Sequence, residues 1–311
     1  MTGKIIGTGS YIPDTRWDNN VLAGMMDTSD EWIRERTGIV SRHIADKSTV
    51  SEMACEAAKK ALADAHESDD TFLADDIDVI IVCTLASDVL LPAVSCLVAE
   101  KIGASKAFCY DLNAACSGFL FAYNTCVSYM NSGLVKNALI IGAEKLSDQV
   151  DWSDRGTAIL FGDGAGAAIV KATDGNAHMV MHSDGSRYDA LTLLTGKKMY
   201  MDGQKVFRFA LKSVPEVIEE LLLGADMKKS DVDMYVLHQA NKRIIEGVAK
   251  RLGEDMEKFP MNLSEYGNTS SASIPILLDE LKRSGAIRSG MNIVMAGFGA
   301  GLSWGAATIT V

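Results

Sequence analysis

Asn113-Ala114-Ala115-Cys116-Ser117-Gly118-Phe119 is the stretch that decides the fold class, because it joins two segments with different periodicities. Residues 107–112 before it have the apolar character of a strand, and residues 118–131 after it have the spacing of a helix. A strand, a tight turn and a helix in this order predict an α/β fold. The turn follows the logic of a nucleophile elbow, and it holds a cysteine.

Cys116 is therefore a candidate nucleophile. A thiol at a helix N-terminus feels the positive end of the helix dipole, so we expect a lowered thiol pKa. The small residues beside it leave room for a substrate carbonyl. Taken alone, a cysteine between alanines is more often part of the core, so this role depends on the surrounding pattern.

The alternation of strands and helices continues on both sides of this stretch. Short apolar runs typical of buried strands lie at residues 77–83, 138–142, 234–237 and 292–296. Helical patterns lie at residues 51–65, 242–252 and 273–284. The glycine-rich residues 161–168 precede an apolar run and lack the ending of a phosphate-binding loop, so we interpret them as a tightly packed strand.

A weak internal repeat indicates two related halves. Asp76-Ile77-Asp78 is echoed by Asp231-Val232-Asp233, and the turn at residues 132–136 is echoed at nearly the same offset by residues 284–288. We therefore predict two pseudo-symmetric α/β halves, residues 1–172 and 173–311. The repeat places Asn268 opposite Cys116, and His238 opposite Cys83. If the halves pack symmetrically, Cys116, His238 and Asn268 converge on one pocket.

Each of these residues has a plainer interpretation. His238 lies at a strand end in His238-Gln239-Ala240-Asn241, where a buried structural histidine is as reasonable as a functional one. Asn268 follows Gly267, and Gly-Asn is a common turn. The segment 297–301 offers backbone N–H groups close to a substrate, although it also fits a tight turn between two strands.

Composition excludes several classes of protein. The 311 residues carry a net charge of −11, which argues against non-specific nucleic-acid binding. The six cysteines show neither C-x-x-C spacing nor a histidine-rich partner segment, so we expect no disulfide framework and no metal site. The sequence shows no apolar run of membrane-spanning length and no secretion signal, so we expect a cytoplasmic protein without a membrane anchor.

Taken together, these motifs resemble one family. The Cys-His-Asn constellation, Thr8–Pro13, Asp27–Ile33, Arg36–Ile39 and Phe161–Ala167 are similar to motifs of β-ketoacyl-acyl carrier protein synthase III over essentially the whole chain. Thiolases place a second cysteine near the C-terminus and elongating synthases use two histidines, whereas the second half here has no cysteine.

The resemblance implies a thiolase fold, five layers in the order α-β-α-β-α, in a homodimer. It also implies that Cys116 takes an acyl group from acyl-CoA, and that malonyl-acyl carrier protein then decarboxylates and attacks it to give 3-oxoacyl-acyl carrier protein. The N–H groups of Cys116 and Gly299 would form the oxyanion hole, and neutral His238 with Asn268 would donate to the enolate oxygen. No cofactor is implied.

The resemblance also implies binding residues. Trp32 and Arg155 would sandwich the CoA adenine, Thr28 would bond to it, and Arg36 would contact the phosphates. Gly203, Phe207 and Asn241 would line the pantetheine tunnel, and Leu91 would bound the acyl pocket across the dimer. An acidic carrier protein would dock on a basic patch formed by Arg208, Lys242, Arg243, Lys250 and Arg251, for which an ordinary solvated helix face is the alternative.

Other functions stay open at this point. The segment 187–203 is shorter than is usual in the family, and Leu91 stands where many relatives have a bulky aromatic residue, so the acyl starter is not fixed. A secondary-metabolism synthase that uses an unusual starter is the main alternative. A Cys-His-Asn hydrolase or acyltransferase would release its acyl group without decarboxylation, and a binding subunit would lack the nucleophile.

Overall fold

The computed structural model describes residues 1–311. Its first sheet has five strands. Their order is β1-β7-β6-β4-β5. The strands are β1 (Thr2–Tyr11), β4 (Val79–Cys83), β5 (Phe108–Leu112), β6 (Asn137–Glu144) and β7 (Gly164–Thr173). β4 runs parallel to both β5 and β6, while β7 is antiparallel to β6 and β1.

The second sheet repeats this pairing with one strand fewer. Its order is β11-β12-β13-β8, with β11 parallel to β12 and the other pairs antiparallel. The strands are β8 (Met179–Ser183), β11 (Met234–Leu237), β12 (Ile293–Gly299) and β13 (Ser303–Ile309). The series β4-β6-β7-β1 in the first sheet therefore has a counterpart in the second. The boundary between residues 172 and 173 stays a prediction.

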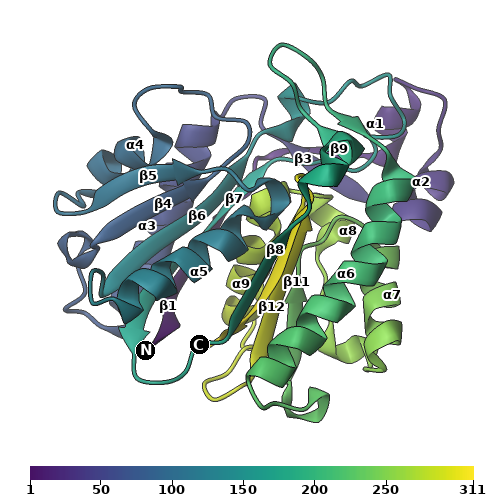
Figure 1. Ribbon diagram of the computed structural model, residues 1–311. Coiled ribbons are helices and arrows are strands. Elements are labelled where there is room, and N and C mark those ends of the chain that lie inside the picture. The colour runs from purple at the N-terminus through teal and green to yellow at the C-terminus, as the bar shows by residue number, and fades with distance from the viewer.

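Helices complete five layers (Figure 1). α5 (Gly118–Asn131) and α9 (Ser273–Arg283) lie between the two sheets and share one buried apolar cluster with both. α3 (Val50–Ser68) and α4 (Val94–Ile102) cover the outer face of the first sheet, and α6 (Gly203–Gly224) and α7 (Lys242–Leu252) cover that of the second. This is the α-β-α-β-α arrangement expected of the thiolase fold.

Short elements surround one end of these layers. Two small sheets pair β2 (Thr15–Asp18) with β3 (Ser41–Ile44), and β9 (Leu191–Thr192) with β10 (Tyr200–Met201). The short helices are α1 (Asn19–Ala23), α2 (Asp30–Thr37) and α8 (Leu263–Tyr266). The single turns used below are η2 (Ala115–Ser117) and η7 (Ser270–Ala272), which follow β5 and precede α9.

Local sequence explains where several elements begin and end. The strand at 234–237 and the helices at 118–131 and 242–252 have the predicted bounds. Asn241 caps α7 by accepting from the Arg243 N–H, and Gly253 ends that helix in the left-handed conformation.

No helix of the chain is both long enough and apolar enough to cross a membrane.

Glycines let the second half approach the first sheet closely. A Cβ atom on Gly142 of β6 would lie 2.2 Å from the carbonyl oxygen of Ser271, and one on Gly166 of β7 would lie 2.6 Å from the backbone nitrogen of Ile276. Neither position has room for a side chain. Because β7 begins at Gly164, the interpretation as a tightly packed strand is confirmed for residues 164–168, while residues 161–163 precede the strand. The close approach brings η7 next to the end of β6.

Candidate active site

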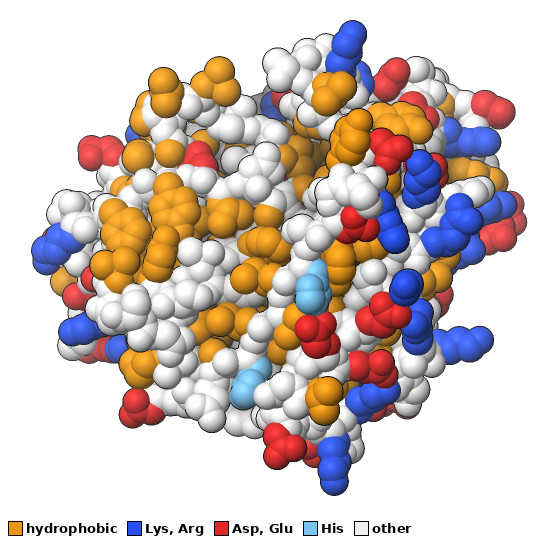
Figure 2. Space-filling model, viewed as in Figure 1, with side chains coloured by type: hydrophobic (Ala, Val, Ile, Leu, Met, Phe, Trp, Pro, Cys, Tyr) orange, Lys and Arg blue, Asp and Glu red, His pale blue; other side chains and the backbone are white.

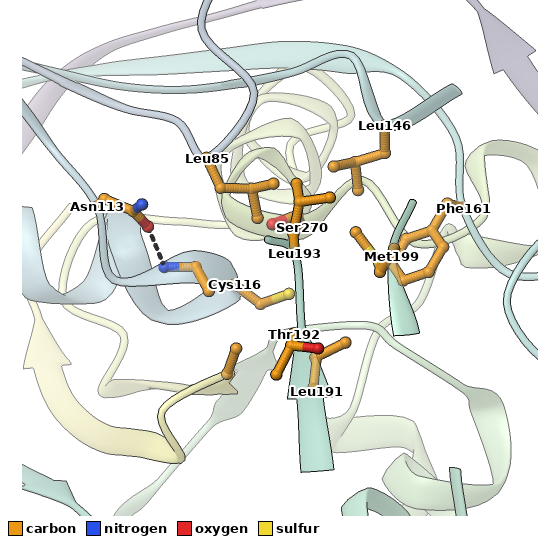
Figure 3. A pocket seen from close by; sticks show the side chains of 12 residues that line it. Leu85, Asn113, Cys116, Leu146, Phe161, Leu191, Thr192, Leu193, Met199 and Ser270 are labelled. Atoms are coloured by element: carbon orange, nitrogen blue, oxygen red, sulfur yellow. Dashed lines mark hydrogen bonds between the residues drawn. The ribbon is translucent and has the colours of Figure 1, made fainter. Parts of the chain in front are cut away.

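Cys116 lies in the turn η2 between β5 and α5, as the sequence predicts. The preceding residue, Ala115, has a φ of 48°, a left-handed conformation that costs a non-glycine residue about 1–2 kcal/mol. The Asn113 side chain supports the turn by accepting from the Ala115 N–H at 3.1 Å, the bond drawn in Figure 3. The strained turn holds the nearly buried Cys116 side chain in a fixed direction.

Two cavities meet at Cys116. The first has a volume of about 210 Å³, and Figure 3 shows the Cys116 sulfur pointing into it. Its walls are mostly apolar and include Leu85, Leu146, Phe161, Leu191, Leu193 and Met199. The second, of about 190 Å³, also reaches Cys116 and is lined by His238, Asn268, Phe298 and Gly299, among others. A thioester in the second cavity could therefore transfer an acyl chain into the first.

The structure brings His238 and Asn268 to the same cavity as Cys116 and buries both. His238 follows β11, and its Nδ1 lies 2.7 Å from the hydroxyl of Ser273. The Asn268 side-chain oxygen accepts from the Ser270 N–H at 2.8 Å, which leaves its NH2 group available as a donor. The convergence that the repeat predicts is thus present, with Phe298 packed edge-on against the His238 ring.

Gly299, at the end of β12, lies directly against the backbone of Cys116. A Cβ atom on Gly299 would stand 2.8 Å from the Cys116 nitrogen. The backbones of the two residues are therefore in close contact beside the second cavity, which both residues line. Only glycine fits at this point.

Burial controls the ionisation of both candidate catalytic groups. It raises the pKa of the Cys116 thiol to about 12, although the Ser270 hydroxyl lowers it in part. This direction is opposite to the one predicted from the helix dipole, because desolvation in an apolar cavity disfavours the thiolate. Burial also lowers the pKa of His238 to about 3, so its imidazole is neutral at physiological pH.

Glu144 is a candidate that the sequence analysis missed. It ends β6, is fully buried, and has a pKa raised by burial to about 7. Its carboxylate accepts from the hydroxyls of Ser270 at 3.0 Å and Ser271 at 2.7 Å, and from the Leu85 N–H at 3.1 Å. A glutamate in an otherwise apolar strand sequence is the one signal that could have drawn notice.

Trp32 of α2 does not line the second cavity, but it is next to Arg36, which does, and two arginines lie over its ring. The guanidinium of Arg155 is 4.5 Å from the centre of its ring and that of Arg36 is 5.6 Å away. Arg155 also donates to the Asp27 carbonyl at 3.0 Å. Trp32 and Arg155 are therefore together as predicted, but they contact each other directly, so an adenine between them requires Arg155 to move.

Three further predicted binding residues line the second cavity. Gly203 and Phe207 lie at the start of α6, and Asn241 lies before α7. The Asn241 side chain is already engaged, because its NH2 group donates to the Arg36 carbonyl at 3.0 Å and its oxygen caps α7. The Thr28 hydroxyl is buried without a hydrogen-bond partner.

Two of the five predicted docking residues line a hollow at the mouth of the second cavity. Arg208 and Arg243 lie with Arg36 around a surface hollow of about 420 Å³ at the mouth of the second cavity. Lys242 pairs with Glu246 at 3.6 Å, Arg251 pairs with Glu216 at 3.0 Å, and Lys250 lies toward the opposite end of α7.

Leu91 lies on the loop after β4, outside the first cavity, and its exposed fraction is 88%. The neighbouring Leu90 borders a third hollow of about 600 Å³, which shares Leu85, Asn113 and Leu193 with the first cavity. Leu91 therefore does not bound the acyl cavity of its own chain.

Comparison with known proteins gives one consistent result. Models of 3-oxoacyl-[acyl-carrier-protein] synthase III match residues 110–185 and, for the C-terminal part, residues 222–311. The chain is 43% identical to beta-ketoacyl-[acyl-carrier-protein] synthase III of Clostridium acetobutylicum, over 97% of this chain and 96% of that protein. It is 45% identical to the Clostridium perfringens enzyme of the same name, over 98% of both chains.

Solved structures agree with these sequence comparisons. The crystal structure of 3-oxoacyl-[acyl-carrier-protein] synthase III from Aquifex aeolicus superposes with a TM-score of 0.95 and 41% identity, over 99% of this chain and all of that one. The priming β-ketosynthase of a polyketide biosynthetic pathway superposes with a TM-score of 0.92 and 34% identity, over the whole of this chain and 96% of that one.

Proposed function

The chain belongs to the 3-oxoacyl-[acyl-carrier-protein] synthase III family, the condensing enzymes that initiate fatty-acid synthesis, and we propose that Cys116 carries the acyl group in this reaction. One observation supports the assignment most directly. Cys116, His238, Asn268 and Gly299 all face one cavity, and Cys116 alone also faces the apolar cavity beside it.

In the proposed reaction, the Cys116 sulfur attacks the carbonyl of an acyl-CoA in the second cavity. The oxyanion that forms accepts from the N–H groups of Cys116 and Gly299, and CoA leaves as a thiolate. The acyl chain then occupies the apolar first cavity. Walls of leucine, methionine and phenylalanine exclude water there, which protects the acyl-enzyme from hydrolysis.

Condensation follows when malonyl-acyl carrier protein places its thioester in the second cavity. Loss of CO2 develops negative charge on the thioester oxygen, and the His238 Nε2–H with the Asn268 NH2 group would donate to it. The resulting carbanion attacks the acyl-enzyme, forms the carbon–carbon bond and releases Cys116. Decarboxylation itself supplies the nucleophilic carbon, so the proposal includes no cofactor.

Acyl-CoA binding is proposed to use Arg36, which lines the second cavity, together with the neighbouring Trp32 and Arg155. Trp32 and Arg155 offer a planar ring and a guanidinium that suit a stacked adenine, and Arg36 offers charge for phosphate. The unpartnered Thr28 hydroxyl supports a bond to the base, since a buried hydroxyl without a partner is costly. Gly203, Phe207 and Asn241 would border the pantetheine arm.

The carrier protein is proposed to dock at the mouth of the same cavity, where Arg36, Arg208 and Arg243 gather. Arg243 also packs on the ring of Phe207, with its guanidinium 5.4 Å from the ring centre, so its position is restrained. Arg208→Glu and Arg243→Glu should raise KM for malonyl-acyl carrier protein and reduce its salt dependence. Lys250→Glu, at the other end of α7, is the matched control and should leave KM unchanged.

A homodimer is proposed through the open edge of β5. This strand is paired only on its β4 side, and Figure 2 shows apolar side chains gathered over it. Phe108 is 41% exposed and packs against Tyr129, and the Tyr110 hydroxyl donates to that of Tyr129 at 3.4 Å. Pairing with β5 of a second copy would satisfy the edge. Phe108→Asp should shift the mass measured by light scattering from dimer to monomer.

The acyl starter has two candidate classes. The first is an ordinary acyl-CoA starter of fatty-acid synthesis. The second is an unusual or longer starter, which is supported by the match to a priming β-ketosynthase and by the opening of the first cavity toward the third hollow. In the proposed dimer, Leu91 of a second copy would close that opening. The cytoplasmic location stays a prediction from the sequence.

The deciding experiment separates acylation from condensation. The protein would be mixed with acyl-CoAs from acetyl through isobutyryl to octanoyl, and intact mass would report acylation, with Cys116→Ala as the control. A chase with malonyl-acyl carrier protein should give 3-oxoacyl-acyl carrier protein and CO2, and the panel would identify the starter. An adduct that the chase never discharges would favour a hydrolase or acyltransferase instead.

A further inference from the structure

Glu144 is a fully buried acid that has no part in the reaction as proposed above. Four groups donate to its carboxylate. The Leu85 N–H and the Thr84 hydroxyl, which follow β4, bond to Oε2 at 3.1 and 3.3 Å. The Ser270 and Ser271 hydroxyls of η7 bond to Oε1 at 3.0 and 2.7 Å. Each half of the chain supplies two donors, so this one carboxylate links the first half to η7 in the second.

Ser270 extends the link to Asn268. The Ser270 N–H donates to the Asn268 side-chain oxygen at 2.8 Å. This bond decides which end of the amide is the acceptor, and it leaves the NH2 group as the donor for the second cavity, which Asn268 lines. Two hydrogen bonds through a single residue therefore connect the Glu144 carboxylate to the Asn268 amide.

The backbone of Ser270 needs a restraint of this kind. Its φ is 52°, a left-handed conformation that is unfavourable for any residue with a side chain and that the surrounding structure has to hold. The hydroxyl bond to Glu144 is one such restraint. It acts on the same residue whose N–H orients Asn268, so a loss of this bond should loosen the amide.

The first half contains an equivalent turn. Asn113 and Asn268 each accept from the N–H two residues later, and Ala115 has a φ of 48° where Ser270 has one of 52°. The turn η2 leads into α5 as η7 leads into α9. The two turns are therefore pseudo-symmetric copies, and they differ in what lies beside them.

The strand ends beside the two turns explain why a glutamate is present. β12 ends at Gly299 next to Cys116, and its counterpart β6 ends at Glu144 next to Ser271. Beside η2 the glycine leaves the second cavity open to a substrate. Beside η7 the Glu144 side chain lies in the corresponding place. The turn next to Asn268 is thus bound permanently, while the turn that holds Cys116 stays open.

We propose that Glu144 is a positioning residue for the condensation step, and that it holds the Asn268 amide in place through Ser270. The inference deepens the proposed function and rests on Asn268 as a donor to the enolate oxygen. Glu144 lines neither cavity, so it acts on the substrate only through the other two residues. Acylation uses Cys116 and Gly299 and should not require this link.

Three variants test the link. Ser270→Ala removes only the hydroxyl, and Ala115 shows that alanine adopts this backbone conformation in the equivalent turn. Glu144→Gln keeps the size of the side chain but leaves one acceptor oxygen for four donors. Ser147→Ala is the matched control, because the Ser147 hydroxyl donates to another buried carboxylate, that of Asp163, at 2.6 Å and away from η7.

Two rates would be measured for each variant, with thermal unfolding as the check on folding. Intact mass gives the acylation of Cys116 by acyl-CoA, and CO2 release from malonyl-acyl carrier protein gives the condensation step. Ser270→Ala and Glu144→Gln should each slow CO2 release about 10-fold, as the loss of a hydrogen bond to a charged group predicts, and leave acylation unchanged. Ser147→Ala should change neither rate.

A double variant tests the path through Asn268. If Glu144 acts through this amide, Ser270→Ala should cause no further loss of CO2 release when Asn268→Ala is already present. Losses that multiply in the double variant would overturn the positioning role, as would a folded Ser270→Ala or Glu144→Gln variant that releases CO2 at the parent rate. CO2 release at the parent rate in Asn268→Ala alone would instead overturn the donor role in the proposed function, and the positioning role with it.

Discussion

Ser273→Ala is the substitution that most directly tests how His238 is oriented. The Ser273 hydroxyl lies 2.7 Å from His238 Nδ1, at the start of α9. For Nε2 to carry the proton that is donated to the enolate, Nδ1 must accept, and Ser273 is the donor that it accepts from. Without that hydroxyl the proton can move to Nδ1, and Nε2 would then face the developing charge as an acceptor.

The size of the effect follows from this one hydrogen bond. A neutral buried hydrogen bond contributes about 1 kcal/mol, which corresponds to a loss of about fivefold in the decarboxylation rate. Removing the whole ring in His238→Ala removes a donor worth a few kcal/mol, or about 100- to 1,000-fold. Because the His238 pKa is about 3, neither loss should be recovered by changing pH between 5 and 8.

The assay follows CO2 release from malonyl-acyl carrier protein after Cys116 has been acylated beforehand, and the acylation rate itself serves as the internal control. Ser273→Ala should slow CO2 release and leave acylation unchanged. Equal rates of CO2 release in Ser273→Ala and the parent protein would refute the orienting role. A loss as large as that of His238→Ala would instead indicate that Ser273 contacts the substrate.

Three further predictions concern other parts of the site. Gly299→Ala should slow acylation at least about 100-fold and should also lower the melting temperature, because its Cβ would lie 2.8 Å from the Cys116 nitrogen, where there is no room for it; near-normal acylation would contradict the proposed oxyanion hole. Trp32→Ala should raise KM for acyl-CoA between about 2- and 30-fold by removing the stacking surface beside Arg155, and an unchanged KM would place the adenine elsewhere. Burial raises the Glu144 pKa from 4.5 to about 7, so between these pH values only the folded state keeps the proton. The free energy of unfolding should therefore fall by about 3 kcal/mol as pH rises from 4.5 to 7. Urea titrations of Glu144→Gln should no longer show this dependence of stability on pH.

Features that depend on nearby residues could be predicted from the sequence. α5, α7 and β11 have the predicted bounds because their apolar spacing is local, and α7 is also capped by Asn241 and Gly253. The convergence of Cys116 and His238 depends on distant segments, but the internal repeat encoded it, since equivalent strand ends meet when the two halves pack symmetrically. Contacts between distant segments can thus be predicted where an internal sequence repeat relates those segments by symmetry.

Features set by burial against distant segments could not be predicted. The basic residues of α7 read as one patch, yet Arg251 is paired with Glu216 of α6 and only Arg243 reaches the cavity mouth. Glu144 ends an apolar strand, and the serine that bonds to it lies 126 residues later in the chain. Apart from the apolar strand that it ends, nothing near Glu144 in the sequence marks it as buried or as a neighbour of Cys116.

The wrong prediction for the thiol shows why burial matters most at this site. The same desolvation acts on both groups with opposite sign: it raises the pKa of Cys116 to about 12 and lowers that of His238 to about 3. Both groups are therefore neutral in the free protein, which suits a histidine that must donate but not a cysteine that must attack. The apolar cavity that shields an acyl-enzyme from water thus also disfavours the thiolate that must form it.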